Sequence, residues 1–132
     1  MSSFVVDREA LKQRLSSLEY NVTQNAITEE PFTGKFNEFW ENGIYSCIVC
    51  DQQLFTSKTK YDSGCGWPAF FDSLDDRKLC FKPDHKKAPR IRTEITCSRC
   101  DAHLGHLFLN ELKPKTGKRY CINSAALKFS HH

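Results

Sequence analysis

Two Cys-x-x-Cys pairs constrain the fold of this chain more than any other feature of its sequence. They are Cys47 with Cys50 and Cys97 with Cys100, and each pair ends a run of residues typical of a β-strand. Two intervening residues let a tight turn direct both thiolates at one ion, and two such turns complete the tetrahedron that Zn²⁺ prefers. Because four thiolates close the coordination sphere, we predict a structural zinc ion that joins distant strands. The alternative, two redox-active dithiols, is typical of a βαβ context that the sequence lacks.

The composition is that of a globular protein with reduced cysteines. The chain has 132 residues, of which 39% are hydrophobic, too many for a disordered chain, and we predict a single domain over residues 1–132. The net charge of +3 is too small to indicate a nucleic acid or an anionic membrane as partner. A signal peptide and an apolar run of about 18 residues are both missing, so we expect a cytoplasmic protein. There, seven cysteines favour metal or thiol chemistry over disulfide bonds.

The N-terminal third is expected to contain one helix followed by an irregular segment. Leu11, Leu15 and Leu18 recur at helical spacing after Asp7, a residue suited to the N-cap, which predicts a helix over residues 8–19. The segment that follows, up to Gly43, is rich in aromatic residues but lacks a period. We expect it to form an ordered wrap with one short helix near residues 36–40.

The rest of the chain reads as short strands. Seven β-type runs are separated by turn residues, at 44–49, 54–56, 77–82, 91–96, 107–109, 119–123 and 127–129. We therefore predict a mainly β fold, an antiparallel domain of two packed sheets with an N-terminal helix and the four-cysteine zinc site. The Pro-Lys-Thr-Gly sequence at residues 114–117 predicts a hairpin that sets Phe108 and Cys121 on neighbouring strands.

Three cysteines remain beside the four zinc ligands, and their surroundings differ. Cys65 lies between two glycines, which predicts a thiol on a loop that can move. Cys121 lies in a strand-like run whose alternation places Arg119 and Asn123 on the same face. A guanidinium beside a thiol lowers the pKa of that thiol, so Arg119 is expected to favour the nucleophilic thiolate. Cys80 lies in an apolar run, as a small hydrophobic residue would.

A His-Leu-Gly-His segment follows the second cysteine pair directly. Attachment to a metal-bound turn would hold the imidazole of His103 or His106 in a fixed position, as general acid catalysis requires. Two alternatives stay open, because His103 could complete a Cys₃His zinc site or both rings could be packed polar side chains. Trp67 taken by itself is more typical of a core aromatic than of a pocket wall, and the basic residues between 82 and 92 are typical of a solvated loop.

Five segments together carry a resemblance to a known family. They are PFTGKF at 31–36, CIVC at 47–50, SGCGWPAF at 63–70, TCSRCDAHLGHLF at 96–108 and KRYCINSAALKF at 118–129. In this order and at this spacing they resemble the methionine sulfoxide reductase B family. The resemblance implies a zinc-stabilised antiparallel β fold that reduces the R epimer of methionine sulfoxide in oxidised proteins. It also implies recycling by thioredoxin or a similar dithiol.

The resemblance implies a role for each site residue. Cys121 matches the catalytic nucleophile and Cys65 the resolving cysteine, so a sulfenic acid on Cys121 would condense to a Cys65–Cys121 disulfide. His106 would supply the proton to the sulfoxide oxygen, and Trp67 would contact the S-methyl group of the substrate. The other residues expected in the site are Arg119 and Asn123, with His103 and Phe108 contributing to substrate binding.

The chain departs from the family pattern in three places, and there no role is transferred. Residues 84–90 lack the Ser-His-Gly-Met segment that family members often carry, and residues 109–112 replace an acidic, glycine-containing turn. Asp51 and Asp101 stand where glycines often follow each Cys-x-x-Cys. The resemblance therefore implies no role for the loops at these positions.

Two other classes of function share some of these features. A zinc-stabilised β module that binds a peptide without chemistry would need the four ligand cysteines but not Cys65 and Cys121. A nucleic-acid-binding zinc domain would need a broader basic face. The two additional thiols favour the enzyme, and we expect a monomer with neither a nucleic-acid nor a membrane partner.

Overall fold

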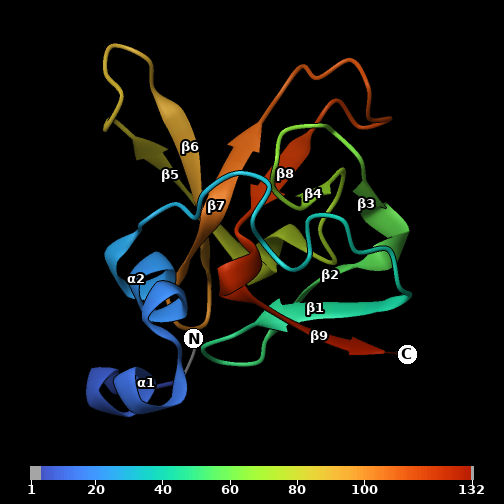
Figure 1. The fold of residues 1–132 in the computed structure, drawn as a ribbon. Helices are drawn as coiled ribbons and strands as arrows, with labels where there is room; N and C mark the ends of the chain where they lie inside the picture. Colours follow the sequence, from blue (N-terminus) through green and yellow to red (C-terminus); the bar gives the residue numbers. More distant parts are fainter. Residues whose placement is uncertain (1–3, 132) are drawn as a thin grey trace.

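Figure 1 shows the computed structural model, which describes residues 4–131. Two antiparallel sheets form the body of the molecule. The smaller sheet has the order β2-β1-β9, with β1 at Gly43–Cys47, β2 at Gln53–Thr56 and β9 at Leu127–His131. The larger sheet has the order β3-β4-β8-β7-β6-β5: Lys60–Tyr61, Ala69–Phe70, Arg119–Ile122, His103–Phe108, Arg92–Cys97 and Leu79–Asp84. Every paired strand is antiparallel to its neighbour. The predicted fold class is therefore confirmed.

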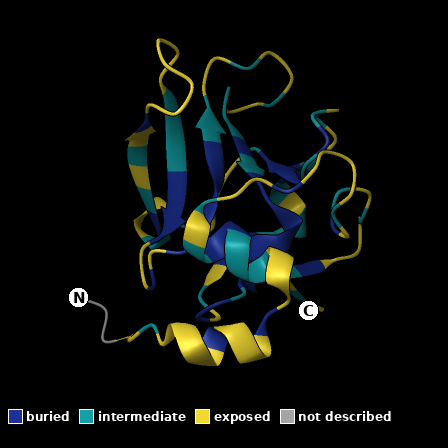
Figure 2. Ribbon diagram, turned by 60° about the vertical axis from the view of Figure 1, so that its left-hand side comes forward, coloured by how far each residue is buried: buried dark blue, intermediate teal, exposed yellow. Residues whose placement is uncertain are grey.

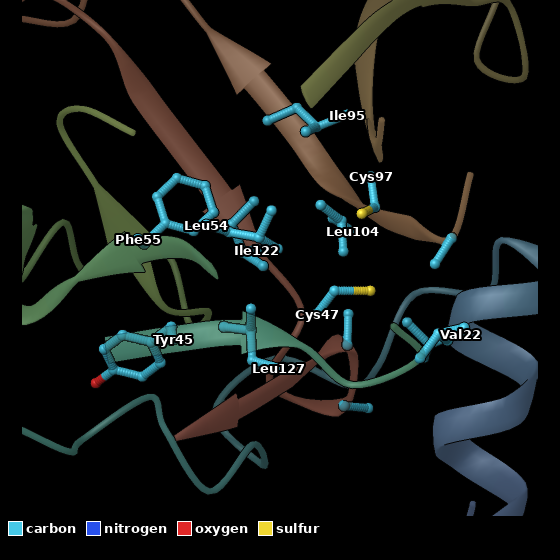
Figure 3. Close-up of a cluster of buried hydrophobic side chains, with 14 of the residues drawn as sticks. Val22, Tyr45, Cys47, Leu54, Phe55, Ile95, Cys97, Leu104, Ile122 and Leu127 are labelled. Carbon is cyan, nitrogen blue, oxygen red and sulfur yellow. The ribbon is translucent and has the colours of Figure 1, made fainter. Parts of the chain in front are cut away.

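The hydrophobic core lies between the sheets, as Figure 3 shows. Tyr45 and Leu127 come from the small sheet, Ile122 comes from the large one, and all three are fully buried. Val22 of helix α2 (Ser17–Asn25) covers the same cluster from the side. Cys47 and Cys97 lie inside this cluster with both side chains fully buried, so the predicted metal ligands belong to the core itself.

The prediction of a single helix over residues 8–19 is wrong, because two helices occupy this part of the chain. Helix α1 spans Arg8–Arg14 and α2 begins at Ser17. Between them Ser16 forms a capping box: its hydroxyl accepts the Glu19 N–H, and the Glu19 carboxylate accepts the Ser16 N–H. Most of α1 is exposed in Figure 2. Leucines recur at helical spacing through the break, but α1 ends at Arg14 and the Ser16 cap starts α2.

The short helix expected near residues 36–40 is also absent, and turns take its place. Tertiary contacts occupy the backbone groups that a helix would use. The Phe36 N–H donates to the Ser124 hydroxyl, and the Lys60 ammonium donates to the carbonyl oxygens of Asn37 and Phe39. An aromatic cluster of Phe36 with its neighbours then holds the segment on the small sheet.

Strand β7 begins at His103, four residues before the predicted start at 107. It carries a bulge, because His103 lies opposite Thr96 and Gly105 lies opposite Ile95, so that Leu104 is the extra residue. The short strands β3 and β4 were not predicted. The hairpin prediction is confirmed, since the Gly117 N–H donates to the Pro114 carbonyl and β7 pairs with β8.

No helix within residues 4–131 has the length and apolar character needed to cross a membrane. Three short 3₁₀ turns complete the secondary structure of this part of the chain, at Ser57–Thr59 (η1), Asp76–Lys78 (η2) and Ser124–Ala126 (η3). Of these, η3 begins two residues after β8 ends and packs against α2.

Candidate active site and metal centre

Cys65 and Cys121 form a thiol pair, with their Sγ atoms 3.6 Å apart. Cys121 lies on β8 between β4 and β7, opposite Ala69 and His106. Cys65 lies on the loop before β4, between Gly64 and Gly66, both of which have positive φ. The separation is short enough for an S–H···S hydrogen bond and requires only a small shift to form a disulfide.

A pocket of about 240 Å³ surrounds this thiol pair. Seven predicted site residues line it: Cys65, Trp67, His106, Phe108, Arg119, Cys121 and Asn123. Thr28, Arg90, Arg92 and Gly105 line it as well, although the sequence did not single them out. Gly105 is needed where β7 and β8 approach, because a Cβ there would lie 2.0 Å from the Cys121 carbonyl oxygen.

His106 lies beside Cys121 and is held by a carboxylate. The two residues are directly opposite each other on β7 and β8, so their side chains share one face of the sheet. His106 Nε2 is 2.7 Å from Asp84 Oδ2, and the same carboxylate oxygen is 3.3 Å from the Arg92 guanidinium. Burial lowers the pKa of His106, and the hydrogen bond with Asp84 opposes that shift. With Nε2 engaged, Nδ1 is the ring nitrogen that can meet a substrate.

His103 stands outside the pocket lining but contacts the catalytic candidate. Its ring lies edge to face against His106, with 5.6 Å between ring centroids, and its Nδ1 is 2.7 Å from Glu94 Oε2. Residues three apart on a regular strand point to opposite faces, so the bulge at Leu104 is what brings the two rings together. Burial lowers the pKa of His103.

Trp67 and Asn123 are both positioned by Glu29. The Trp67 indole N–H donates to the Glu29 carbonyl at 3.1 Å, and the Glu29 N–H donates to Asn123 Oδ1 at 3.0 Å. Asn123 Nδ2 donates to the Leu104 carbonyl, so the amide of Asn123 already joins two parts of the chain. The buried Glu29 carboxylate accepts the N–H groups of Ser124 and Ala125 at the start of η3. Glu29 therefore ties the irregular N-terminal segment to the pocket wall.

Arg119 lines the pocket and is held by two contacts. Its guanidinium lies 4.2 Å from the centroid of the Phe108 ring, a cation–π contact across the β7–β8 pair. Its Nε donates to Glu111 at 2.8 Å. Glu111 belongs to the loop that departs from the family pattern, so this loop supplies the carboxylate that fixes Arg119.

The pKa values of the two thiols shift in opposite directions. The hydrogen bond with Cys121 lowers the pKa of Cys65 to about 5. The same hydrogen bond, together with burial, raises the pKa of Cys121, and the guanidinium of Arg119 only partly opposes this. Arg119 lowers the pKa of Cys121 as expected, but burial and the contact with Cys65 outweigh its effect.

The four predicted metal ligands form a single cluster. The Sγ atoms of Cys47, Cys50, Cys97 and Cys100 all lie within 4.8 Å of one another, and all four residues are buried. Four thiolates at such separations fit a tetrahedral Zn²⁺ site and could hold the ion. The Gln52 side-chain amide donates to Cys97 Sγ at 3.3 Å and to the Lys78 carbonyl, which orients that sulfur. His103 is paired with Glu94 instead, so the Cys₃His alternative finds no support.

Asp51 and Asp101 occupy the two positions where a glycine was expected. Both have a positive φ, 66° and 63°, the left-handed conformation that glycine adopts most easily and aspartate tolerates. Each carboxylate pairs with a lysine of a neighbouring strand, Asp51 with Lys128 and Asp101 with Lys82. The turns thus keep their shape without glycine.

Several residues that shape the site were missed by sequence reasoning, and the signals that could have found them differ. Asp84 and Arg92 end and begin adjacent strands, opposite each other, so a charge pair across the hairpin could have been proposed. Glu29 and Thr28 lie in a segment without periodicity, and their contacts are to residues about ninety positions away or across the pocket. No local pattern predicts such contacts.

Comparison with known proteins finds a matching family model and individual relatives. A family model described as the SelR domain matches residues 15–131. Methionine-R-sulfoxide reductase B1 of Drosophila melanogaster is 52% identical over 135 aligned positions, covering 94% of this chain and 64% of the relative. Peptide methionine sulfoxide reductase MsrB of Escherichia coli (strain K12 / DH10B) is 48% identical over 122, covering 92% of this chain and 88% of the relative. This chain thus spans slightly less than two thirds of the Drosophila protein.

Proposed function

Because the chain belongs to the methionine sulfoxide reductase B family of peptide methionine sulfoxide reductases, we propose that it reduces the R epimer of methionine sulfoxide in proteins to methionine. The observation that carries the proposal is the pair of thiols, 3.6 Å apart, in a pocket that they share with an imidazole. A binding module without chemistry would have no use for these two cysteines. The pocket wall supplied by Trp67 and Phe108 suits the thioether end of a methionine side chain.

The first step is attack of the Cys121 sulfur on the sulfoxide sulfur. Cys121 becomes the nucleophile when its proton moves to Cys65 across the S–H···S contact. The sulfoxide oxygen is a poor leaving group until it is protonated, and His106, beside Cys121, is the group placed to supply that proton. The protonated oxygen then passes as hydroxyl from the substrate sulfur to the Cys121 sulfur, so the substrate S–O bond breaks and the S–O bond of a Cys121 sulfenic acid forms. The sulfur–sulfur bond made by the attack breaks, its electron pair stays on the substrate sulfur, and methionine leaves.

The second step joins the two cysteine sulfurs. The Cys65 sulfur attacks the sulfur of the Cys121 sulfenic acid, the sulfur–sulfur bond forms and the S–O bond breaks. The hydroxyl leaves as water with the proton that Cys65 took from Cys121 in the first step. The protein has then lost two thiols and the substrate one oxygen, so the electrons balance.

Recycling needs an external dithiol that opens the Cys65–Cys121 disulfide by exchange. We propose thioredoxin or a similar protein, because the Cys65 loop is partly exposed and Gly64 has open space around it. Such a partner fits the predicted cytoplasmic location and the predicted monomer. The four-cysteine cluster holds a structural zinc ion in this proposal, away from the reacting sulfurs.

The test separates the three additional cysteines by single-turnover chemistry. Reduced protein is mixed with each epimer of a blocked methionine sulfoxide peptide, and methionine and free thiols are counted. Wild type is expected to release one equivalent of methionine from the R epimer while losing two thiols. Cys121→Ser forms no methionine, because the nucleophile is gone. Cys65→Ser forms one equivalent and leaves a sulfenic acid on Cys121 that dimedone traps.

Cys80→Ser is the matched control, because Cys80 lies on the edge strand β5 and does not line the pocket. It should behave as wild type in both the single-turnover assay and the thioredoxin-coupled assay. Methionine formation by Cys121→Ser would overturn the nucleophile assignment. Full thioredoxin-dependent turnover by Cys65→Ser, with loss in Cys80→Ser, would move the resolving role to Cys80.

A further inference from the structure

We propose that the pocket mouth contains a carboxylate-binding subsite centred on Arg90, so that this chain prefers methionine sulfoxide with a carboxylate close by. The inference deepens the proposed reductase function and rests on it. It concerns the loop between β5 and β6, which departs from the family pattern and for which the resemblance implies no role.

Apart from the two cysteine thiols, every ionisable side chain that lines the pocket is basic. Among its eleven lining residues are three arginines, Arg90, Arg92 and Arg119, and no aspartate or glutamate. A cleft lined by one sign of charge concentrates ligands of the opposite sign at its mouth. The mouth of the pocket, away from the two sulfurs, therefore favours an anion over a cation.

Two of these arginines are already committed to protein carboxylates. Arg92 pairs with Asp84, and Arg119 pairs with Glu111, in both cases with the arginine partly buried. Arg119 also lies over the Phe108 ring, which leaves its guanidinium little freedom. Neither is positioned to turn toward a new anion at the pocket mouth.

Arg90 differs from the other two. It is exposed, and within residues 4–131 no carboxylate pairs with it; its backbone N–H donates to the Lys87 carbonyl. A guanidinium can donate two parallel hydrogen bonds to the two oxygens of a carboxylate. A neutral amide on the substrate cannot accept hydrogen bonds in this paired way. Arg90 is thus the cation at the pocket that an incoming carboxylate can reach.

The surroundings of Arg90 add positive charge rather than compensate it. Lys86 and Lys87 lie on the same exposed loop, and the Lys86 ammonium contacts a carbonyl oxygen, that of Ala26, rather than an acid. The nearby acid, Asp84, is occupied from three sides by the Lys86 N–H, His106 and Arg92. An acidic group on the substrate would meet no competing carboxylate on this loop.

The carboxylate could have two sources. One is an aspartate or glutamate that flanks the methionine sulfoxide in a polypeptide, and the other is the α-carboxylate of free methionine sulfoxide. Both offer Arg90 the same planar anion. The experiment therefore includes both kinds of substrate.

The test compares kcat/KM on matched blocked peptides of methionine R-sulfoxide whose flanking residues are Asp, Asn or Lys. An exposed ion pair changes binding by about 2- to 5-fold, so wild type should prefer the Asp peptide over the Asn peptide by that factor at low salt. The preference should shrink as salt is raised. Free methionine R-sulfoxide is compared with its amide in the same way.

Arg90→Gln should abolish the ratio between acidic and neutral substrates, and Arg90→Glu should reverse it in favour of the Lys peptide. The use of a ratio cancels any effect common to both peptides. Lys58→Gln is the control, because it removes one exposed positive charge away from the pocket lining. It should keep the wild-type ratio.

If Arg90→Gln loses the ratio between the Asp and Asn peptides, the flanking side chain is the carboxylate that Arg90 binds. If it loses only the ratio between free methionine sulfoxide and its amide, the α-carboxylate is that group. Both outcomes support the subsite. Wild type that does not discriminate, or an Arg90→Gln variant with an unchanged ratio, overturns it. Turnover of the Asn peptide by wild type shows separately that the reductase function holds, so the two failures are distinguishable.

Discussion

At the scale of single residues, the two thiols are expected to titrate as a coupled pair. Only one of the two sulfurs, 3.6 Å apart, carries the charge at a time, because the thiol of one stabilises the thiolate of the other. The hydrogen bond with Cys121 lowers the pKa of Cys65 to about 5, so we expect Cys65 to be the thiolate of the reduced pair. This assignment can be tested by alkylation.

The rate of alkylation of Cys65 by iodoacetamide should rise with pH around 5, because the thiolate is the reacting form and predominates above its pKa. Cys121→Ala removes the largest cause of the lowered pKa, so the midpoint should move upward toward the ordinary thiol value of about 8.5. Peptide mass mapping reads Cys65 separately from Cys80. An unchanged midpoint in Cys121→Ala would contradict the shared-proton description, and Cys80→Ala provides the control.

Asp84 is expected to tune the acid that protonates the sulfoxide. Burial lowers the pKa of His106, and the hydrogen bond and charge of Asp84 raise it. In Asp84→Asn the raising contribution is lost, so the pKa of His106 falls further and the basic limb of the pH–rate profile moves to lower pH. For every pH unit by which this pKa falls, the protonated fraction of His106 at neutral pH decreases about tenfold.

The measurement for Asp84→Asn is kcat against pH with a neutral peptide, together with the thermal midpoint. A positioning role predicts a displaced limb, whereas a merely structural role would lower the rate equally at every pH. Glu94→Gln is a useful comparison, because Glu94 pairs with His103, which does not line the pocket.

At the scale of elements, the site is built by irregularities in regular structure. The bulge at Leu104 turns His103 and His106 to one face of β7, and Gly105 then allows β8 to approach closely. The loop of Gly64 and Gly66 brings Cys65 back over β8, where the Phe32 N–H donates to the Gly66 carbonyl and secures one end. The glycine loop brings Cys65 within reach of Cys121, and the bulge brings His103 against His106.

Glu29 connects the irregular segment before β1 with η3, and its side chain should matter for stability. Its buried carboxylate accepts two backbone N–H groups, whereas a glutamine would direct an NH₂ group at one of them. An unsatisfied buried polar group costs about 1–3 kcal/mol, so Glu29→Gln should lower the free energy of unfolding by that amount. The adjacent exposed Glu30 provides the control: Glu30→Gln should unfold as wild type does. Equal denaturation midpoints for both variants would contradict the role of Glu29.

At the scale of the whole molecule, the four-cysteine cluster joins the two sheets. Cys47 ends β1 in the small sheet and Cys97 ends β6 in the large one, so a bound ion would cross-link strands that are far apart in sequence. We expect one zinc ion per chain, retained in Cys121→Ser and lost in Cys47→Ser. Elemental analysis with circular dichroism checks this.

Loss of zinc should also lower the thermal stability of the fold, since metal binding and folding are coupled at such sites. A wild-type protein that is folded and zinc-free after gentle purification would refute the structural assignment. Retention of the metal in Cys80→Ser would show that the loss in Cys47→Ser is specific to the ligand set.

Much of this protein could be predicted from the sequence, because the relevant signals are local. Two Cys-x-x-Cys turns specify a four-thiolate site by their spacing, and strand alternation with turn residues specifies an antiparallel β fold. The combination of motifs also identified the family, and every residue of those motifs that lines the pocket, except Gly105, was named in advance.

The tertiary structure decided what depends on distance between segments. The partners of His106 and Arg119, the position of Glu29, the break between α1 and α2 and the turns at residues 36–40 all follow from contacts or caps that compete with local propensity. The charge on Cys65 belongs to the same class, because a pKa responds to every neighbour within a few ångströms, whatever its position in the chain. Spacing along a chain determines which groups one turn can hold, whereas only packing determines which groups meet across the pocket.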